Sequence, residues 1–503
     1  MLKAAVIRFE LINQSFPQSS PLMAPISKAL LLGTLWCLQS VIAQSAANDN
    51  NSSVLGVVIF SRHGGRTTKL YPPTLLTNLG ANEVFQSGNY YRSRYINNGS
   101  SNQIAGFSAI YDSKQLYAAV PDTGSESGLL LQSATGLLQG LYPPVLSDPM
   151  TSEVFALANG SQVVAPLNGY QYVVVNSIDA NSPNSIWLAG GSKCPTFAKA
   201  SVNYMNSTEF MSLKASTQSF YNSFAGLLSG VLPENALGYQ NAYTIFDYLN
   251  VNYIHNQTVK NNLTAEDLFQ LRTLADKHEL GLNFNASVPA TTIGAQTFLS
   301  AIQTQLLNVK NGTSKSAVYF GVYPTFLSFF GLANLTTVNE NFTGLPDYAA
   351  TMAFELRNSS TGDISVRFLY KNGSDPNVET QAYPLFGSSS VDMSWDVFNN
   401  NVQKLAIQSQ SDWCKTCGST AAFCKSSSSS ASSESSAASC SNNGSGGLSN
   451  AAAGAIGFGV TTGAYLILGA LLFFLLRRRL GRQSGHSRDA TSGASDKATI
   501  DSH

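Results

Sequence analysis

The sequence predicts an α/β domain followed by one C-terminal transmembrane helix. First, a β-branched apolar run at residues 54–60 ends abruptly in a polar turn with two glycines, as a buried parallel strand does. Second, a helix start at residues 262–267 precedes apolar positions at helical spacing from Leu268 to Leu274. Third, residues 451–476 carry no charge and are long enough to span a bilayer as a helix.

Charge is sparse and balanced along the chain. The 503 residues, enough for one large core or two modest ones, include 29 basic and 29 acidic residues. Only 12% of residues are charged, against about 25% in an average soluble protein. Without a basic surplus to neutralise a phosphate backbone, we expect no nucleic-acid partner. A surface rich in Ser, Thr, Asn and Gly suits solubility through attached sugar.

Sequons of the form Asn-x-Ser/Thr recur between the two hydrophobic segments of the chain and predict N-glycosylation in the secretory pathway. They lie at Asn51, Asn98, Asn159, Asn206, Asn256, Asn262, Asn285, Asn311, Asn334, Asn341, Asn358, Asn372 and Asn443. None lies beyond residue 476. Such confinement to one region is hard to explain for a cytosolic protein.

The N-terminal hydrophobic segment predicts a signal peptide over residues 1–47. Lys28 precedes the apolar run 29–38, and small residues follow it. We expect cleavage between residues 43 and 47, with an uncleaved anchor as the alternative. Met23 would give a more ordinary signal and is a possible true start.

The C-terminal segment predicts a type I membrane protein. Residues 451–476 form the expected span, and the arginines after it, beginning at Arg477, place that end in the cytoplasm. Residues 426–450 read as a Ser-rich stalk and residues 477–503 as a cytoplasmic tail, which leaves 48–425 as the ectodomain. A lipid-anchor signal stays open as an alternative. We expect the cell surface or a vacuolar membrane.

The cysteines predict an oxidising compartment. Cys194, Cys414, Cys417 and Cys424 are disulfide candidates, although the last three also resemble a metal knuckle or a redox pair. Their pairing is open, but a bridge from Cys194 to the 414–424 cluster would clamp the end of the domain onto its middle. Cys440 would remain unpaired in the stalk. No metal signature is apparent.

The turn after the first apolar run carries the chemistry of a phosphate site. It reads Arg62-His63-Gly64-Gly65-Arg66. A neutral imidazole can attack phosphorus and carry the phosphoryl group, so His63 is the candidate catalytic residue. Guanidiniums offer paired donors to phosphate oxygens, which makes Arg62 and Arg66 the candidate binding residues. The glycines would let the backbone approach the anion. The expected ligand is phosphate or a phosphomonoester.

This turn matches the Arg-His-Gly-x-Arg signature of the histidine phosphatase (phosphoglycerate mutase-like) superfamily, and the chain resembles its histidine acid phosphatase and phytase branch. Further matching stretches are 76–95, 132–143, 274–276, 366–385 and 413–414. Thr67 and Thr68 replace the family's x-Pro. The resemblance implies a three-layer sandwich with a mostly parallel sheet, a helical cap over roughly residues 100–290, and catalysis without a cofactor.

The chain is nevertheless a divergent member that lacks the family's His-Asp motif. Such enzymes also use a second Arg before the Ser-Ala pair, and Leu129 falls at that position. An ungapped alignment places the His-Asp pair on Tyr319 and Phe320. Glu126 is a candidate substitute acid. The remaining ectodomain histidines, His255 and His278, read as surface or packing residues.

Three hypotheses therefore stay open. The ectodomain is a phosphomonoester hydrolase that works through a phosphohistidine at His63 with a degraded acid/base site. Alternatively, it is a catalytically inactive, phosphate-binding or cell-surface protein. In the third reading, the turn is only an inherited salt network in a structural glycoprotein. A positioned general acid contributes about 10²- to 10⁴-fold in rate, so its loss favours the last two. Retention of Arg62, His63 and Arg66 together favours the first two.

Overall fold

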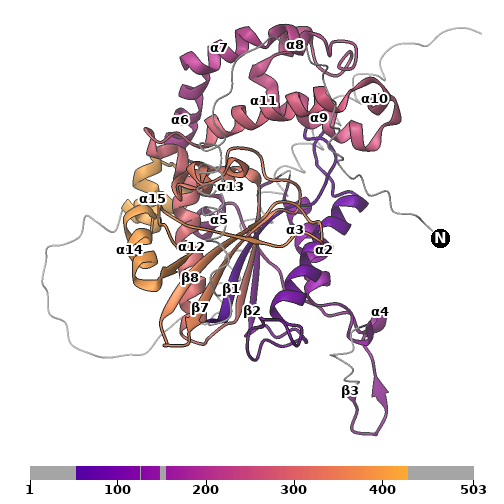
Figure 1. The fold of residues 1–503 in the computed structure, drawn as a ribbon, viewed down its shortest axis with the longest axis vertical. Coiled ribbons are helices and arrows are strands. Elements are labelled where there is room, and N and C mark those ends of the chain that lie inside the picture. Colours follow the sequence, from indigo (N-terminus) through magenta and orange to yellow (C-terminus); the bar gives the residue numbers. More distant parts are fainter. Residues whose placement is uncertain (1–51, 125, 148–154, 429–503) are drawn as a thin grey trace, which may run out of the picture. The chain divides into compact units, whose positions relative to one another are not determined.

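The computed structural model describes residues 52–124, 126–147 and 155–428, and a single mixed sheet lies at the centre of this part of the chain (Figure 1). Its order is β10-β8-β7-β1-β6-β2-β5, with β9 paired to β8. The strands are β1 (Ser52–Arg62), β2 (Leu116–Pro121), β5 (Asn176–Ile178), β6 (Ser316–Gly321), β7 (Thr351–Ser359), β8 (Ile364–Lys371), β9 (Gln381–Tyr383) and β10 (Asp392–Ser394). A separate hairpin consists of β3 (Phe155–Ala156) and β4 (Gln162–Val163).

The sheet is mixed rather than mostly parallel, which corrects the expectation from sequence. The β1–β6, β2–β6 and β2–β5 pairs are parallel. The β1–β7, β7–β8, β8–β9 and β8–β10 pairs are antiparallel. The cause is local: β7 and β8 are joined by a tight turn in which Gly362 has a φ of +89°. A turn this short joins only antiparallel strands, since a parallel pair needs a long crossover.

Helices cover both faces of the sheet (Figure 1). The helices of the described residues are α2 (Asn78–Tyr95), α3 (Ser127–Leu141), α4 (Pro166–Gly169), α5 (Ile186–Ala189), α6 (Pro195–Met205), α7 (Thr208–Ser216), α8 (Gln218–Asn222), α9 (Ala242–His255), α10 (Gln257–Asn262), α11 (Ala265–Asn283), α12 (Ile293–Lys310), α13 (Tyr323–Leu332), α14 (Trp395–Leu405), α15 (Gln410–Cys417) and α16 (Ala422–Ser428). Alternate residues of β1 face opposite layers: Val57 and Ile59 pack with α2 and α3, whereas Val58 and Phe60 pack with α12 and α13. The α/β expectation is confirmed.

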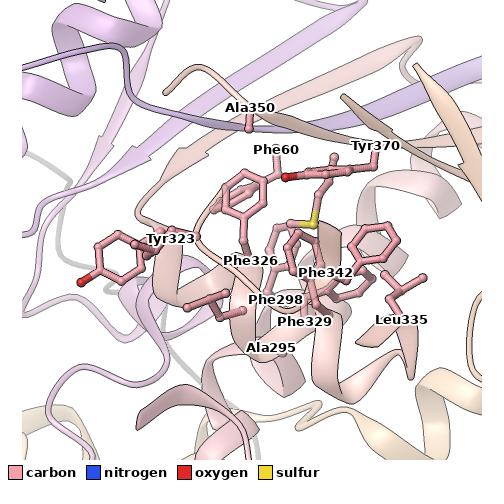
Figure 2. Packing of buried hydrophobic residues seen from close by; sticks show 14 of the residues in the cluster. Phe60, Ala295, Phe298, Tyr323, Phe326, Phe329, Leu335, Phe342, Ala350 and Tyr370 are labelled. Carbon is pink, nitrogen blue, oxygen red and sulfur yellow. The ribbon is translucent and has the colours of Figure 1, made fainter. Parts of the chain in front are cut away.

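An aromatic cluster fixes the end of β1 that precedes the 62–66 turn. Figure 2 shows Phe60 among Phe298, Phe326 and Phe329. The ring centroid of Phe60 lies 4.6 Å from that of Phe298 and 5.1 Å from that of Phe326. All these rings are fully buried. Such packing leaves little freedom to the strand that carries the turn.

The predicted helix start near residue 262 is confirmed in α11. Thr264 is its N-cap, and the hydroxyl accepts a hydrogen bond from the backbone N–H of Asp267 at 3.0 Å. Leu271 and Leu274 are buried on the inner side of this helix. The helices from α6 to α11 lie apart from the sheet in Figure 1. Within the expected cap range, however, β2 and α3 belong to the sheet and its covering layer, and the cap boundaries stay a prediction.

The four candidate cysteines form two disulfide bonds, which confirms the expectation that they are structural disulfides. Cys194 bonds Cys417, and Cys414 bonds Cys424. The first links positions 223 residues apart and joins the start of α6 to the end of α15. It is the clamp that the sequence suggested. Because these four sulfurs are bonded in pairs, the metal-knuckle reading of the cluster is wrong.

The described part of the chain also bears on the glycosylation and membrane expectations. Ten of the eleven sequon asparagines that the structure describes are exposed, and Asn358 is half-buried, so nearly all are accessible to modification. Across residues 52–124, 126–147 and 155–428, no helix has the length and apolarity needed to cross a membrane. The expected signal peptide, transmembrane segment and cytoplasmic tail lie outside the described residues, as do Cys440 and residues 429–450 of the stalk.

Candidate active site

The 62–66 turn leaves the sheet at the carboxyl end of β1, where the backbone is tightly packed. A Cβ atom on Gly64 would lie 2.1 Å from the carbonyl oxygen of Gly80, at the start of α2. Gly64 therefore serves the close approach of the turn to this helix, rather than the approach of an anion as the sequence suggested. Thr77 caps α2 and donates its hydroxyl to the carbonyl of Gly65 at 3.0 Å, which ties the two segments together.

His63 is completely buried and held in one tautomer. Its side chain is 0% exposed, and its Nδ1–H donates to the carbonyl oxygen of Gly64 at 2.8 Å. Since a carbonyl only accepts, Nε2 carries the lone pair, and this atom has no hydrogen-bond partner among the described residues. Burial, followed by the charges of Arg62 and Arg66, lowers the pKa of His63 well below its ordinary value. The imidazole is neutral, as a nucleophile must be.

The two arginines of the turn are buried but differ in their partners. Arg66 forms an ion pair with Asp247 at 2.8 Å and also donates to the Tyr243 hydroxyl at 2.9 Å. Arg62 forms no ion pair with the described residues; it donates to the carbonyl of Pro346. One guanidinium is thus neutralised inside the protein and the other is not.

Tyr348 covers the turn. Its ring centroid lies 5.7 Å from that of His63 and 4.6 Å from the guanidinium carbon of Arg62. The guanidinium carbon of Arg66 lies 5.8 Å from the same ring. A cation over an aromatic face is attractive, so the ring and the two guanidiniums stabilise one another. His63, the catalytic candidate, is itself 0% exposed and is in ring contact with this tyrosine.

A polar cavity of about 280 Å³ opens next to this cover, but it does not reach the imidazole. Arg62, Glu83 and Tyr348 help to line it, whereas His63 does not. Glu83 also occupies a backbone donor of the turn, since the Gly65 N–H donates to its carboxylate at 2.7 Å. Burial raises the pKa of Glu83. The backbone donor that an anion cradle would offer is therefore already used.

The positions that should complete a phosphatase site hold the wrong chemistry. Leu129, in place of the second Arg, is a buried residue of α3. Tyr319 and Phe320 lie inside β6, and Arg62 is in register with Gly321. The residues that leave this neighbouring strand beside His63 are consequently Val322 and Tyr323.

Neither of these two residues offers a histidine or a carboxylic acid. Tyr323 lies apart from the phenylalanine cluster in Figure 2, and its hydroxyl donates to Glu279 at 2.8 Å. The guanidinium carbon of Arg62 is 5.5 Å from the Tyr323 ring centroid. The phenol hydroxyl is therefore committed to a buried carboxylate instead of facing a leaving group.

The candidate substitute acid and the other histidines are also accounted for. Glu126 forms an ion pair with Lys69 at 2.9 Å, so its carboxylate already has a cationic partner. His255 is exposed at the end of α9. His278 is buried, and its Nδ1 lies 2.8 Å from a carboxylate oxygen of Glu279. Across the described residues, no group of three or more His, Cys, Asp or Glu is placed to hold a metal.

Sequence reasoning missed four residues that shape this site: Lys69, Tyr243, Asp247 and Tyr348. Lys69 and Asp247 flank it with charge, and Asp247 also accepts hydrogen bonds from the Thr68 hydroxyl and the Lys69 N–H. The ammonium of Lys69 lies 5.1 Å from the Tyr323 ring centroid. Lys69 is three residues past Arg66, and its position near the motif was a usable signal. The other three are distant in sequence and follow no motif.

Together, the fold and the turn define a histidine-phosphatase-like domain, and comparison with known families identifies it further. The model of the histidine phosphatase superfamily, branch 2, matches residues 69–371, more than half of the chain. The chain belongs to this family. The matched region begins after Arg66 and does not include the 62–66 turn. The assignment of the turn therefore rests on its Arg-His-Gly-x-Arg motif and on its geometry. No curated protein matches the chain.

Solved structures with a similar fold are distant. The phytase of Citrobacter braakii is 15% identical, with 71% of this chain and 98% of that chain covered at a TM-score of 0.49. A Hafnia alvei phytase in complex with myo-inositol hexakis sulphate is 13% identical, with 72% and 98% covered at 0.48. A Bifidobacterium longum multiple inositol polyphosphate phosphatase complex with inositol hexasulfate is 14% identical, with 73% and 97% covered at 0.37. At such identities these matches support no inference about activity.

Proposed function

We propose that this protein is a membrane-anchored glycoprotein of the secretory pathway whose phosphatase-like ectodomain does not hydrolyse phosphomonoesters. One observation carries the proposal: the Nε2 atom of His63, the only ring nitrogen with a free lone pair, is fully buried, and the Tyr348 ring packs against the same imidazole. A nucleophile must lie about 3–3.5 Å from the reacting atom. No substrate reaches that distance while the imidazole stays fully buried.

The loss of the other catalytic groups supports the same proposal. Phosphoryl transfer depends on cations around the equatorial oxygens and on protonation of the leaving oxygen. Arg66 already pairs with Asp247, and Leu129 supplies no charge. Tyr323, the first residue of α13 and two residues past β6, donates its hydroxyl hydrogen bond to Glu279. Each of these losses acts on the transition state, so moving Tyr348 aside would not by itself restore catalysis.

A second candidate function, hydrolysis through a phosphohistidine, rests on a different observation. Arg62 Nε, His63 Nε2 and Arg66 Nε are buried nitrogens of one turn that lack hydrogen-bond partners among the described residues. Leaving buried polar atoms unpaired is costly, which favours a polar ligand at this turn. In that function, Nε2 forms a bond to phosphorus as the ester P–O bond breaks, and the leaving oxygen takes its proton from water to depart as the alcohol. Water then releases phosphate from the imidazole.

The membrane placement rests on residues outside the described part of the chain and remains a proposal. The two disulfides and the ten exposed sequon asparagines support a secretory route. Digestion of the cellular protein with an N-glycosidase should lower its apparent mass. Deleting residues 451–503 should release the ectodomain into the medium. An unglycosylated or cytosolic product would contradict this placement.

An assay of the purified ectodomain on p-nitrophenyl phosphate separates the two candidate functions. We expect no turnover that depends on His63, so wild type and His63→Ala should give the same background rate. Tyr348→Ala tests the cover: we expect it to let phosphate raise the melting temperature without creating turnover. A rate that is measurable in wild type and lost in His63→Ala would overturn the proposal and establish the hydrolase.

A further inference from the structure

A second cavity lies away from the 62–66 turn and has a different chemistry. It has a volume of about 590 Å³, within the range of about 300–1,000 Å³ that is usual for ligand sites. Its walls come from β2, β5 and β6 and from α5 and α12. It therefore opens at the β5 edge of the sheet, on the face that α12 covers. We call it the α5–α12 cavity.

Three aromatic side chains form part of its lining. Tyr117 of β2 is 36% exposed, and its ring meets that of Tyr319 edge-on at a centroid distance of 6.1 Å. Tyr319 itself is buried and is hydrogen-bonded to Gln305. Trp187 of α5 is half-buried and packs against the core. Packing fixes these rings, so they can offer an apolar face to a ligand at little entropic cost.

The polar part of the lining is almost uncharged. Gln305, Gln408 and Asn184 contribute amides, and several hydroxyl groups lie beside them. Asp179 is the only charged residue among the described residues that line the cavity. Without Lys or Arg, the cavity has nothing to neutralise a phosphate or a carboxylate. Amides donate and accept hydrogen bonds, and a carboxylate accepts them. Amides and carboxylates can therefore both bind neutral hydroxyl groups.

We propose that the α5–α12 cavity binds a neutral oligosaccharide. A sugar ring presents apolar C–H groups on its face and hydroxyl groups around its rim. The face matches Tyr117 or Trp187, and the rim matches the amides and Asp179. This inference does not depend on the function proposed for the 62–66 turn, because the two sites share no lining residue.

The sugar has two possible sources with the same chemistry. One is a glycan on another molecule. The other is an N-glycan of this chain, and Asn311 is an exposed sequon residue at the C-terminal end of α12. Thr304 of the same helix lines the cavity, seven residues or about 10 Å away along the helix axis. A glycan on Asn311 would be close enough to fold back.

Calorimetric titration of the glycosylated ectodomain with chitotriose, mannotriose and laminaritriose tests the proposal. We expect at least one of them to bind, and Tyr117→Ala to weaken its binding about tenfold or more. Asp179 accepts a hydrogen bond from the backbone N–H of Asn181 at 2.6 Å, and Asp179→Asn keeps an oxygen for this bond. The variant removes only the charge and should weaken sugar binding several-fold. Tyr71→Ala removes a more exposed tyrosine that does not line the cavity and should change the affinity less than about twofold.

Repeating the titration after enzymatic removal of N-glycans distinguishes the sources. A gain in affinity identifies the chain's own glycan as the resident occupant, whereas an unchanged affinity identifies a separate glycan. If none of the three sugars binds the deglycosylated ectodomain, the proposal is overturned. Binding that Tyr117→Ala and Asp179→Asn leave unchanged, in variants whose melting temperatures match wild type, would also overturn it.

Discussion

The 62–66 turn and the α5–α12 cavity are built in opposite ways. The turn carries the family signature, two arginines and a histidine, yet its side chains are buried and Tyr348 closes it. The cavity carries no motif and one charge, yet it stays open to a ligand of moderate size. The difference teaches that a signature can be present while the atom that would react is buried. Function requires an accessible reactive atom, and only the geometry reveals that.

The two regions also differ in what holds them together. At the turn, charges and aromatic rings interlock, so each depends on its neighbours. At the cavity, the walls are secondary-structure elements whose positions are set by the core and by a disulfide that begins five residues after α5. Variants at the turn should therefore be costly in stability, and variants at the cavity rim should act mainly on binding.

The largest effect should come from removing the carboxylate at the turn. Asp247→Ala leaves Arg66 buried and unpaired and should lower the free energy of unfolding by about 3–5 kcal/mol. It also removes the acceptor for the Thr68 hydroxyl and the Lys69 N–H. Urea unfolding monitored by fluorescence measures the loss.

A matched double variant sharpens this prediction. Replacing both partners with apolar residues, Arg66→Met with Asp247→Leu, removes the unpaired charge and should destabilise less than Asp247→Ala alone. If Asp247→Ala is as stable as wild type, Arg66 is not dependent on this ion pair. The turn would then be more open than the structure indicates.

The next largest effect should appear on the cavity side. Replacing Cys194 and Cys417 with alanine releases the segment that follows α5 and should cost about 2–4 kcal/mol. Replacing Cys414 and Cys424 instead is the matched control, because that bridge closes a loop of 10 residues rather than 223 and should cost less. Equal losses of stability in the two variants would show that the entropy of loop closure does not determine how much each disulfide stabilises the fold.

A smaller effect should distinguish the turn by its pH dependence. The folded pKa of His63 lies below its unfolded value near 6.5. Between these values the unfolded chain binds a proton that the folded chain does not, so stability falls as the pH falls. The slope contributed by His63 should reach about 1.4 kcal/mol per pH unit below pH 6.5 and vanish above it.

Comparing wild type with His63→Gln isolates this contribution. Glu83 has a raised pKa and acts in the opposite direction, but it is present in both proteins. Urea unfolding at pH 7.5, 6.5 and 5.5 should give a steeper loss on acidification in wild type. Parallel pH profiles would mean that His63 is solvated in the folded state.

Much of this architecture was predictable from local patterns. The strand that ends at Arg62 and the helix that begins after Thr264 follow from short-range signals. The bridge from Cys194 to the C-terminal cluster was one possibility, with the pairing left open by the sequence. The mixed character of the sheet was not foreseen. The apolar run of β1 reads as buried on both faces, which is equally true beside a parallel or an antiparallel neighbour.

The state of the candidate site could not be predicted in the same way. Tyr348 reaches His63 from 285 positions along the chain, and Asp247 reaches Arg66 from a separate helix. Such contacts depend on tertiary packing and leave no periodic or motif signal. The ungapped alignment pointed to Tyr319 and Phe320, whereas the β1–β6 register puts Gly321 opposite Arg62, so that Val322 and Tyr323 are the residues that leave β6 beside His63.

Chemical modification of the histidines tests the sealed turn most directly. Diethylpyrocarbonate acylates neutral, accessible imidazoles, and peptide mass spectrometry gives the rate at each site. We predict that His63, although neutral, reacts at least about tenfold more slowly than the exposed His255 in the same sample. Tyr348→Ala should accelerate His63 and leave His255 unchanged. If His63 in the wild-type ectodomain reacts as fast as His255, the turn is open and the account is contradicted.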